Sequence, residues 1–406
     1  MSASEPTAQD PVIWIAVHDL SRTGVPVLLA RLLQASPARQ REVVHLVAMY
    51  GGPLFNELQG LCASVTVLEP SDRRSGSSAA SLGLITLGMG RAGEVVRHSA
   101  WRAKLARRPK PDVLLVHGAG AWPITQVVSS NLPVVLHLHE LETALDRSIP
   151  RPEQAAAFQR AQQVMVVSAP VAELARNRGA NSAKILLVPG CVRLPDADLP
   201  DANVPESNEA DVHETDTPYI DTPYIDTPYI ETVQWDLGAG TPGWRKGTDR
   251  LAAVAHELHR VNSPAQVGWV GGRPTGADAS AVGRTDLVNW IPESADPWKL
   301  LSHAAVFVLP SREDPLPLVA LEAGVYRRAV VAMPTGGLPD LLADGRGLVG
   351  SRQDVRWFVA AVQQVLASRA LAEDLGQRLH EFVRSHHDVD VIAPRWLQAV
   401  SDTAGR

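Results

Sequence analysis

Short apolar runs alternate along the chain with segments whose apolar residues recur at helical spacing. The runs are rich in Val, Ile and Leu, which is typical of parallel strands buried on both faces. We expect strands at residues 12–17, 42–48, 65–68, 112–116, 133–138, 163–167 and 184–188, and again at 233–237, 265–270, 288–291, 306–309 and 329–332. This alternation predicts an α/β fold with parallel sheets. A chain of 406 residues, 45% of them apolar, is long enough for two such domains.

Residues 194–232 separate the two series of strands and differ from them in composition. Between residues 196 and 231 there are eleven acidic residues and no Lys or Arg, and the segment ends in three tandem copies of D-T-P-Y-I. A five-residue period with a proline in every copy matches neither a helix nor a regular strand, so we predict a low-complexity insertion that does not pack. We expect domains at 1–193 and 233–385, joined by the insertion 194–232, with a final helix at 386–406 that can cross back to the first domain.

Charge and cysteine content narrow the classes of partner. The net charge of −6 comes from the acidic insertion, and the rest of the chain is mildly basic. That balance suits a phosphate-bearing ligand but is too weak to indicate nucleic acid. The two cysteines, Cys62 and Cys191, form no disulfide framework or thiolate metal site, and the first residues lack the pattern of a signal peptide. We therefore expect a cytoplasmic protein.

Residues 90–110 combine basic side chains with Val95, Val96, Trp101 and Leu105. This basic amphipathic pattern is suited to peripheral contact with an anionic membrane, such as the inner face of a cell membrane. A solvated surface helix would give the same pattern, and both interpretations stay open.

The stretch 306–324 carries the strongest indication of a binding site. An apolar strand runs into a polar turn and then, after Pro315 and Pro317, into a helix. In an open α/β sheet, ligands bind at the carboxyl ends of the strands, where helix amino termini attract anions. Asp314 and Glu322 are placed to hold one ligand from two sides. The alternative is that Asp314 caps the helix and Glu322 is solvated.

Three other strand ends carry candidate site residues. His139 and Glu140 follow the strand 133–138, and Gly24 lies in the loop after the first strand. His137 is more readily explained as a buried core residue. Lys246 follows the strand 233–237, where a lysine can serve as a point charge for phosphate.

The loop after the strand 233–237 also permits a different class of function. Gly238, Gly240 and Gly243 satisfy the G-x-G-x-x-G fingerprint of an NAD(P)-dependent oxidoreductase. Pro242 interrupts the fingerprint, and the next helix is expected to start only at an N-cap Thr248. The strand 265–270 ends without the acidic residue that a ribose requires.

Several of these motifs, in this order, resemble the retaining nucleotide-sugar glycosyltransferases of family 4. The sequence D-P-L-P-L-V-A-L-E-A, from Asp314 to Ala323, is similar to the family signature E-P-F-G-L-V-x-L-E-A. Lys246 and Gly247 match the end of the phosphate loop G-R-x-x-x-x-K-G, in which Thr241 takes the place of Arg. Asp314 for Glu and Pro317 for Gly are further departures.

The resemblance implies the B-type glycosyltransferase fold, an α/β architecture of two facing Rossmann-like domains with parallel sheets. It also implies a retaining, hexosyltransferase-type reaction from a nucleotide-diphosphate sugar to a glycan, a lipid-linked or a small-molecule acceptor, without cofactor or metal. The catalytic residues would be His139, Asp314, Glu322 and Lys246. Donor binding would involve Gly24, Thr241, Arg245, Lys246, Arg273, Ile291, Leu316, Leu318, Val319 and Glu322. The departures leave open an inactive nucleotide-sugar-binding protein.

Overall fold

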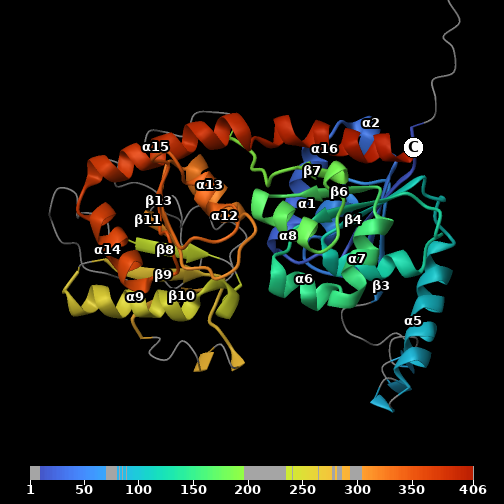
Figure 1. Ribbon diagram of the computed structural model, residues 1–406, viewed down its shortest axis with the longest axis horizontal. Helices are drawn as coiled ribbons and strands as arrows, with labels where there is room; N and C mark the ends of the chain where they lie inside the picture. Colours follow the sequence, from blue (N-terminus) through green and yellow to red (C-terminus); the bar gives the residue numbers. More distant parts are fainter. Residues whose placement is uncertain are drawn as a thin grey trace, which may run out of the picture.

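The computed structural model describes residues 10–69, 80–81, 83–84, 86–87, 89–195, 235–239, 241–263, 265–276, 279–280, 286–292 and 304–405. They form two parallel sheets that lie side by side (Figure 1). The D-T-P-Y-I repeats and Gly240 lie outside the described residues.

The first sheet has the strand order β3-β2-β1-β4-β5-β6-β7, and its strands all run parallel. The strands are β1 (Ile13–Val17), β2 (Val44–Tyr50), β3 (Ser64–Glu69), β4 (Val113–His117), β5 (Val134–Leu138), β6 (Gln163–Val166) and β7 (Ile185–Leu187). Its helices are α1 (Gly24–Ala35), α2 (Ala38–Arg41), α3 (Phe55–Gln59), α5 (Gly90–Leu105), α6 (Glu142–Ser148), α7 (Arg151–Arg160) and α8 (Ala169–Asn177), with short 3-10 segments η1 (Ala119–Gln126) and η2 (Ser182–Lys184).

The second sheet is also parallel, in the order β10-β9-β8-β11-β12-β13. Its strands are β8 (Trp235–Ala239), β9 (Gln266–Val270), β10 (Val288–Ile291), β11 (Ala304–Leu309), β12 (Ala329–Ala332) and β13 (Leu348–Val349). Around it lie η3 (Trp244–Lys246), α9 (Thr248–Arg260), α12 (Leu318–Val325), α13 (Leu338–Leu341), α14 (Val355–Leu366) and α15 (Arg369–His386).

Each sheet has a hydrophobic core on both faces, which explains its continuous apolar strands. Successive side chains of a strand point to opposite faces. In β1, Ile13, Ile15 and Val17 therefore belong to one core, and Trp14 and Ala16 belong to the other. The predicted α/β class with parallel sheets is confirmed.

One predicted strand ends later than expected. The expected strand 233–237 is β8, which extends through Ala239, and Gly238 pairs with Trp269 of β9. A glycine can continue a strand because the hydrogen bonds between neighbouring strands use only main-chain groups. Gly238 is therefore part of the sheet and not of a ligand-binding loop.

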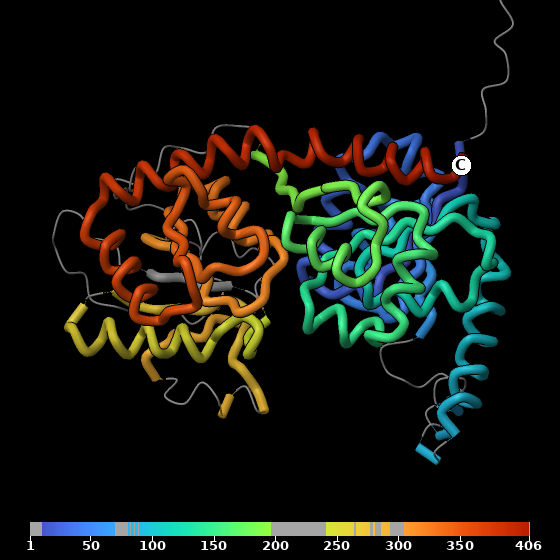
Figure 2. Tube along the Cα trace, in the orientation of Figure 1, coloured from blue at the N-terminus to red at the C-terminus, as the bar shows by residue number. Residues whose placement is uncertain are grey.

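The last two helices connect the two halves. α15 packs on α12 and β12 of the second sheet, and α16 (Val389–Ala404) lies against α1, β4 and β5 of the first (Figure 2). The chain crosses between them at a short main-chain bridge, where Val192 bonds His387 and Val389. Within the described residues, no helix combines the length and apolarity needed to cross a membrane.

Candidate active site

The carboxyl ends of β8 and β11 bring two predicted site segments together. The two strands are parallel neighbours, so the loops that follow them leave the sheet at the same edge. The Lys246 ammonium lies 2.5 Å from Oδ2 of Asp314, and the Arg245 guanidinium donates to the Glu313 carbonyl oxygen over 3.1 Å. The predicted phosphate-binding lysine and sugar-binding carboxylate thus form a nearly buried ion pair.

Two glycines allow the close approach of these loops. Gly247 has φ +73°, and a Cβ there would overlap the Pro310 carbonyl. Gly336 has φ +49°, and a Cβ there would overlap the Asp314 carbonyl. Only glycine combines a positive φ with such close backbone contact. These glycines therefore fix the positions of Lys246 and Asp314.

Asp314 and Glu322 adopt neither role of the alternative interpretation. Pro317, without a side-chain hydrogen bond, is the N-cap of α12, and the Asp314 carboxylate is bound to Lys246. Glu322 is only 6% exposed and pairs with Arg31 of α1, which belongs to the first sheet. Burial raises the pKa of Glu322, and the charge of Arg31 opposes that rise. Glu322 is therefore held between the two halves of the molecule.

His139 and Glu140 lie at the carboxyl end of β5. The Glu140 carboxylate accepts hydrogen bonds of 2.8 Å from the main-chain N–H groups of Ala119 and His139. Burial raises the pKa of Glu140 to about 7, against the effect of these bonds and of the Arg245 charge. Burial also lowers the pKa of His139 well below its ordinary value. The His139 ring is therefore neutral at pH 7, whereas the Glu140 carboxyl changes its protonation state near that pH.

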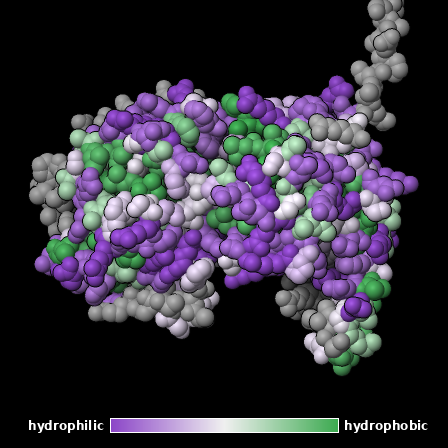
Figure 3. Space-filling model, in the orientation of Figure 1, coloured by the Kyte–Doolittle hydropathy of each residue, from purple (hydrophilic) through white to green (hydrophobic). Residues whose placement is uncertain are grey.

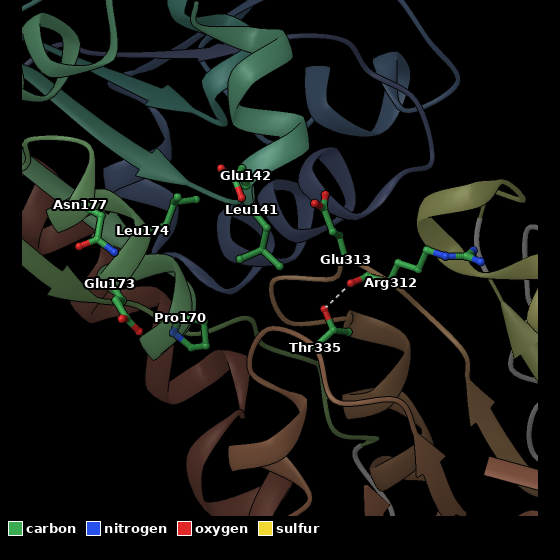
Figure 4. Close-up of a pocket in the computed structure, with 9 residues that line it drawn as sticks. All are labelled: Leu141, Glu142, Pro170, Glu173, Leu174, Asn177, Arg312, Glu313 and Thr335. Carbon is green, nitrogen blue, oxygen red and sulfur yellow. Dashed lines mark hydrogen bonds between the residues drawn. The ribbon is translucent and has the colours of Figure 1, made fainter. Parts of the chain in front are cut away.

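A cavity of about 310 Å³ opens between the two halves (Figure 4). It is lined by Leu141, Glu142, Pro170, Glu173, Leu174 and Asn177 from the first half, and by Arg312, Glu313 and Thr335 from the second. Near it, the Thr143 hydroxyl donates to the Glu313 carboxylate over 2.6 Å. The Ser168 hydroxyl donates to the Pro315 carbonyl over 2.8 Å. The loop after β11 is thus anchored to the first half.

Four other predicted donor-binding residues lie at or after the carboxyl ends of strands, or at the start of a helix. Gly24 is the exposed first residue of α1, with open space beside it, and Thr241 is exposed after β8. Arg273 is exposed after β9. The Ile291 carbonyl accepts the N–H groups of Gly271 and Gly272 over 3.0 and 2.8 Å, so it is already engaged within its own sheet.

The apolar candidates Leu316, Leu318 and Val319 are half-buried. Leu316 and Leu318 lie against Gly190 of the first half, where a Cβ would stand 3.6 and 3.1 Å from their methyl groups. All three pack against the core of the second half. Contact between the halves explains at least Leu316 and Leu318.

Sequence reasoning missed two arginines. Arg31 has no local signal, because its partner Glu322 is 291 residues away. Arg312 makes two hydrogen bonds of 2.6 Å to the Asp249 carboxylate and lies 5.1 Å from the Trp244 ring. Its position in the polar turn after β11, at a strand end already predicted to bind a ligand, would have identified Arg312 as a candidate site residue.

The geometry does not suit the dinucleotide fingerprint. Gly238 is inside β8, a 3-10 turn follows Gly243, and α9 begins only at Thr248. Gly247, in the left-handed conformation, is the N-cap that was predicted at Thr248. The dinucleotide fingerprint needs a glycine loop that runs straight into the amino terminus of a helix, where the pyrophosphate binds. Here the helix starts well after the glycines.

Two parallel sheets facing each other across such a site define the B-type glycosyltransferase architecture. The chain belongs to the family 4 glycosyltransferases: the model "Glycosyltransferase Family 4" matches residues 22–194, and "Glycosyl transferases group 1" matches residues 237–368. The fold is similar to that of Anabaena HepE, crystallised with UDP-glucose, at a TM-score of 0.70 and 12% identity over 96% of this chain and 99% of that one.

Two curated relatives match over shorter segments. Alpha-maltose-1-phosphate synthase of Mycolicibacterium smegmatis is 36% identical over 115 residues, which are 25% of this chain and 29% of that protein. D-inositol 3-phosphate glycosyltransferase of Geodermatophilus obscurus is 31% identical over 153 residues, 36% of this chain and 34% of that protein. The matches therefore span about a third of the length of these relatives.

Proposed function

We propose that the protein transfers a hexose, with retention, from a nucleotide-diphosphate sugar to a glycan, a lipid or a small-molecule acceptor. The observation that carries the proposal is the contact between Lys246 and Asp314 at the adjoining ends of β8 and β11. Family membership and the likeness to a fold crystallised with UDP-glucose support the same class of donor.

The two ion pairs of the site are the contacts that a donor has to replace. A diphosphate offers Lys246 a new anionic partner, which frees the Asp314 carboxylate to accept hydrogen bonds from sugar hydroxyls. The ribose hydroxyls would likewise compete with Arg31 for Glu322. Each charged side chain is thus already at the site, and donor binding exchanges its protein partner for a group of the ligand.

The first half would present His139 to the sugar from the opposite side. The Glu140 carboxylate fixes the main chain of His139 and couples electrostatically to Arg245 of the second half. The reaction would proceed by departure of the diphosphate and attack on the same face of the sugar. The negative charge that develops on the departing diphosphate would be stabilised by Lys246, by Arg245 or Arg273, and by the amino terminus of α12.

We propose that no metal ion or cofactor takes part in the transfer. Activity should survive excess EDTA, and Lys246→Ala should lower turnover by about tenfold to thousandfold, the loss typical of one preorganised charge-stabilising group. Arg395→Ala, which removes an exposed cation of α16 outside the site, is the matched control. An enzyme silenced by EDTA and restored by manganese, with Lys246→Ala nearly as active as wild type, would contradict the proposal.

A ligand screen separates this function from the two alternatives. We expect one of the UDP-, GDP-, ADP- or dTDP-sugars to raise the unfolding temperature, because a ligand at a hundred times its dissociation constant stabilises the native state by about 2.7 kcal/mol. A shift with NAD or NADP alone would indicate an oxidoreductase. Binding of a nucleotide sugar without turnover, across a panel of acceptors, would indicate an inactive binding protein.

We also propose that α5 makes peripheral contact with an anionic membrane. Leu87 and Met89, just before α5, and Val95, near its amino terminus, are all more than half exposed. α5 projects from the first half in Figure 1, and apolar side chains are visible on the projection in Figure 3. Arg107 and Lys110 are exposed beyond its other end. Apolar and basic groups together are what an anionic bilayer surface binds.

A further inference from the structure

Three histidines meet at the carboxyl ends of β4 and β5. His117 ends β4 and is paired in register with His137 of β5, and His139 lies two residues beyond His137 on the same side of the chain. The ring centroids are 5.0 Å apart for His117 and His137, 4.4 Å for His117 and His139, and 4.0 Å for His137 and His139. One nitrogen from each ring lies within 4.8 Å of the other two.

A main-chain contact decides which nitrogen of His117 carries its proton. Nε2 lies 3.2 Å from the Val25 carbonyl oxygen, which can only accept a hydrogen bond. In the neutral ring, Nε2 must therefore carry the hydrogen, and Nδ1 keeps a free lone pair. Metal-binding histidines commonly donate the hydrogen of their other ring nitrogen to such a carbonyl.

Four ring nitrogens of the cluster lack hydrogen-bond partners among the described residues. They are Nδ1 of His117, both ring nitrogens of His137, and Nε2 of His139. The Val188 carbonyl is near the His137 ring, but outside the geometry of a hydrogen bond. His117 and His137 are fully buried, so water does not satisfy these atoms from the bulk solvent. If the three histidines served only to pack the core, these buried nitrogens would stay unpaired, which costs free energy of folding.

We propose that His117, His137 and His139 form a binding site for a zinc-type transition-metal ion. Three imidazole nitrogens suit Zn²⁺, Co²⁺, Ni²⁺ or Cu²⁺ and do not suit Mg²⁺ or Ca²⁺, which prefer oxygen. Zn–N bonds of about 2.0–2.1 Å put tetrahedral donors about 3.4 Å apart, so the rings would turn inward from their present separation. His117 and His137 are buried, whereas His139 is only half-buried. The ion would therefore enter from the side of His139, and its fourth coordination position would stay open on that side.

Metal binding would act on transfer through His139. This consequence depends on the proposed function, in which His139 faces the donor sugar. A ring that coordinates a metal has one nitrogen engaged and a fixed orientation, so it cannot also adjust to the sugar. The site is therefore inhibitory: transfer proceeds without the metal and slows when the metal binds.

Titration of the full-length, chelator-treated protein with Co²⁺ tests the binding. We expect one Co²⁺ per chain, the intense visible absorption of a tetrahedral nitrogen-ligated ion, and its loss when Zn²⁺ is added. His137→Gln and His117→Gln should each weaken Co²⁺ binding at least tenfold. Circular dichroism identifies a variant that fails to fold, and Co²⁺ binding by the other, folded variant then tests the metal site. His45→Gln, which changes a strand histidine bound to Ser64, is the matched control and should bind as wild type does.

The outcomes are distinct. No tetrahedral Co²⁺ spectrum, or one that is unchanged in both cluster variants, would overturn the metal site. If the spectrum is found, Zn²⁺ should lower the transfer rate of the wild type by a larger factor than that of His137→Gln, and equal factors would overturn the inhibitory role. A protein that binds Co²⁺ but transfers no sugar under any condition would contradict the proposed function and leave the metal site supported.

Discussion

At the scale of single residues, the candidate site consists of charges that are buried together in pairs. Lys246 with Asp314, and Arg31 with Glu322, have side chains less than a fifth exposed. Such pairs add little net stability, because desolvation offsets their attraction, but loss of one partner leaves an uncompensated charge. They are therefore better understood as preorganised ligand contacts than as sources of stability.

The Arg31–Glu322 pair gives a test of this view. Arg31→Met should lower the free energy of unfolding by about 3–5 kcal/mol, because it leaves the buried Glu322 carboxylate unpaired. The double variant Arg31→Met, Glu322→Gln should recover most of the loss. Arg39→Met, which breaks an exposed pair with Asp10, should cost less than about 1 kcal/mol in urea unfolding. A double variant no more stable than Arg31→Met would contradict the buried-charge explanation.

Glu140 should make stability depend on pH. Its pKa is raised from 4.5 to about 7, so the folded state keeps the proton over an interval in which the unfolded carboxyl has lost it. Its contribution to stability is complete below pH 4.5 and is lost as pH rises toward 7. Glu140→Gln cannot ionise, so its free energy of unfolding, relative to wild type, should rise across this interval. Urea unfolding at several pH values measures the difference, and a constant difference would contradict the raised pKa.

At the scale of elements, α5 differs from the helices that cover the sheets. Only Gly93, Trp101 and Leu105 of α5 are buried. Two of its basic side chains are engaged within the protein: Arg102 donates to the Gln126 carbonyl and Lys104 to the Leu68 carbonyl. The exposed apolar residues at the other end of the helix therefore matter more for a membrane contact than these two cations.

Vesicle binding tests the role of α5. The protein should sediment with vesicles that contain anionic lipid, and added salt should weaken the binding, because surface charges are screened. Val95→Asp should weaken it further by placing a charge on the exposed face. Val391→Asp, at an exposed apolar position of α16, is the matched control. Equal binding to neutral and anionic vesicles would exclude an electrostatic contact.

At the scale of the whole molecule, α16 joins the two halves. It belongs to the end of the chain that follows the second sheet, yet Ile392, Trp396, Leu397 and Val400 complete a core of the first sheet. The first half therefore lacks part of its core until the last helix docks. The final helix also lies next to the histidine cluster, with the Trp396 ring 6.3 Å from that of His117.

Truncation of the Trp396 side chain tests this dependence. Trp396→Ala should lower the free energy of unfolding by about 3–5 kcal/mol, because it opens a cavity in a core with no exposed surface at that position. Val391→Ala, on the same helix but 41% exposed, should change it by less than about 0.5 kcal/mol. Chemical denaturation measures both, and similar small effects would show that the helix is dispensable.

The sequence alone determined the fold class and most strand positions. An apolar run such as Val306–Leu309 predicts a strand because burial on both faces is a property of the run itself. β8 ends two residues later than predicted: Gly238 is typical of a turn, whereas main-chain pairing with Trp269 keeps it in the sheet. The segment with Asp314, and Lys246 with Gly247, were likewise recognisable from local order along the chain.

Only the tertiary structure decided which of these residues meet. Strand order brings Lys246 to Asp314 across 68 residues, and the packing of the halves brings Arg31 to Glu322. His137 is a core residue in its own segment, and only pairing of β5 with β4 places it beside His117. These contacts depend on strand order and on the orientation of the halves. Neither is encoded in the local pattern of apolar and polar residues, because that pattern specifies burial and not partners.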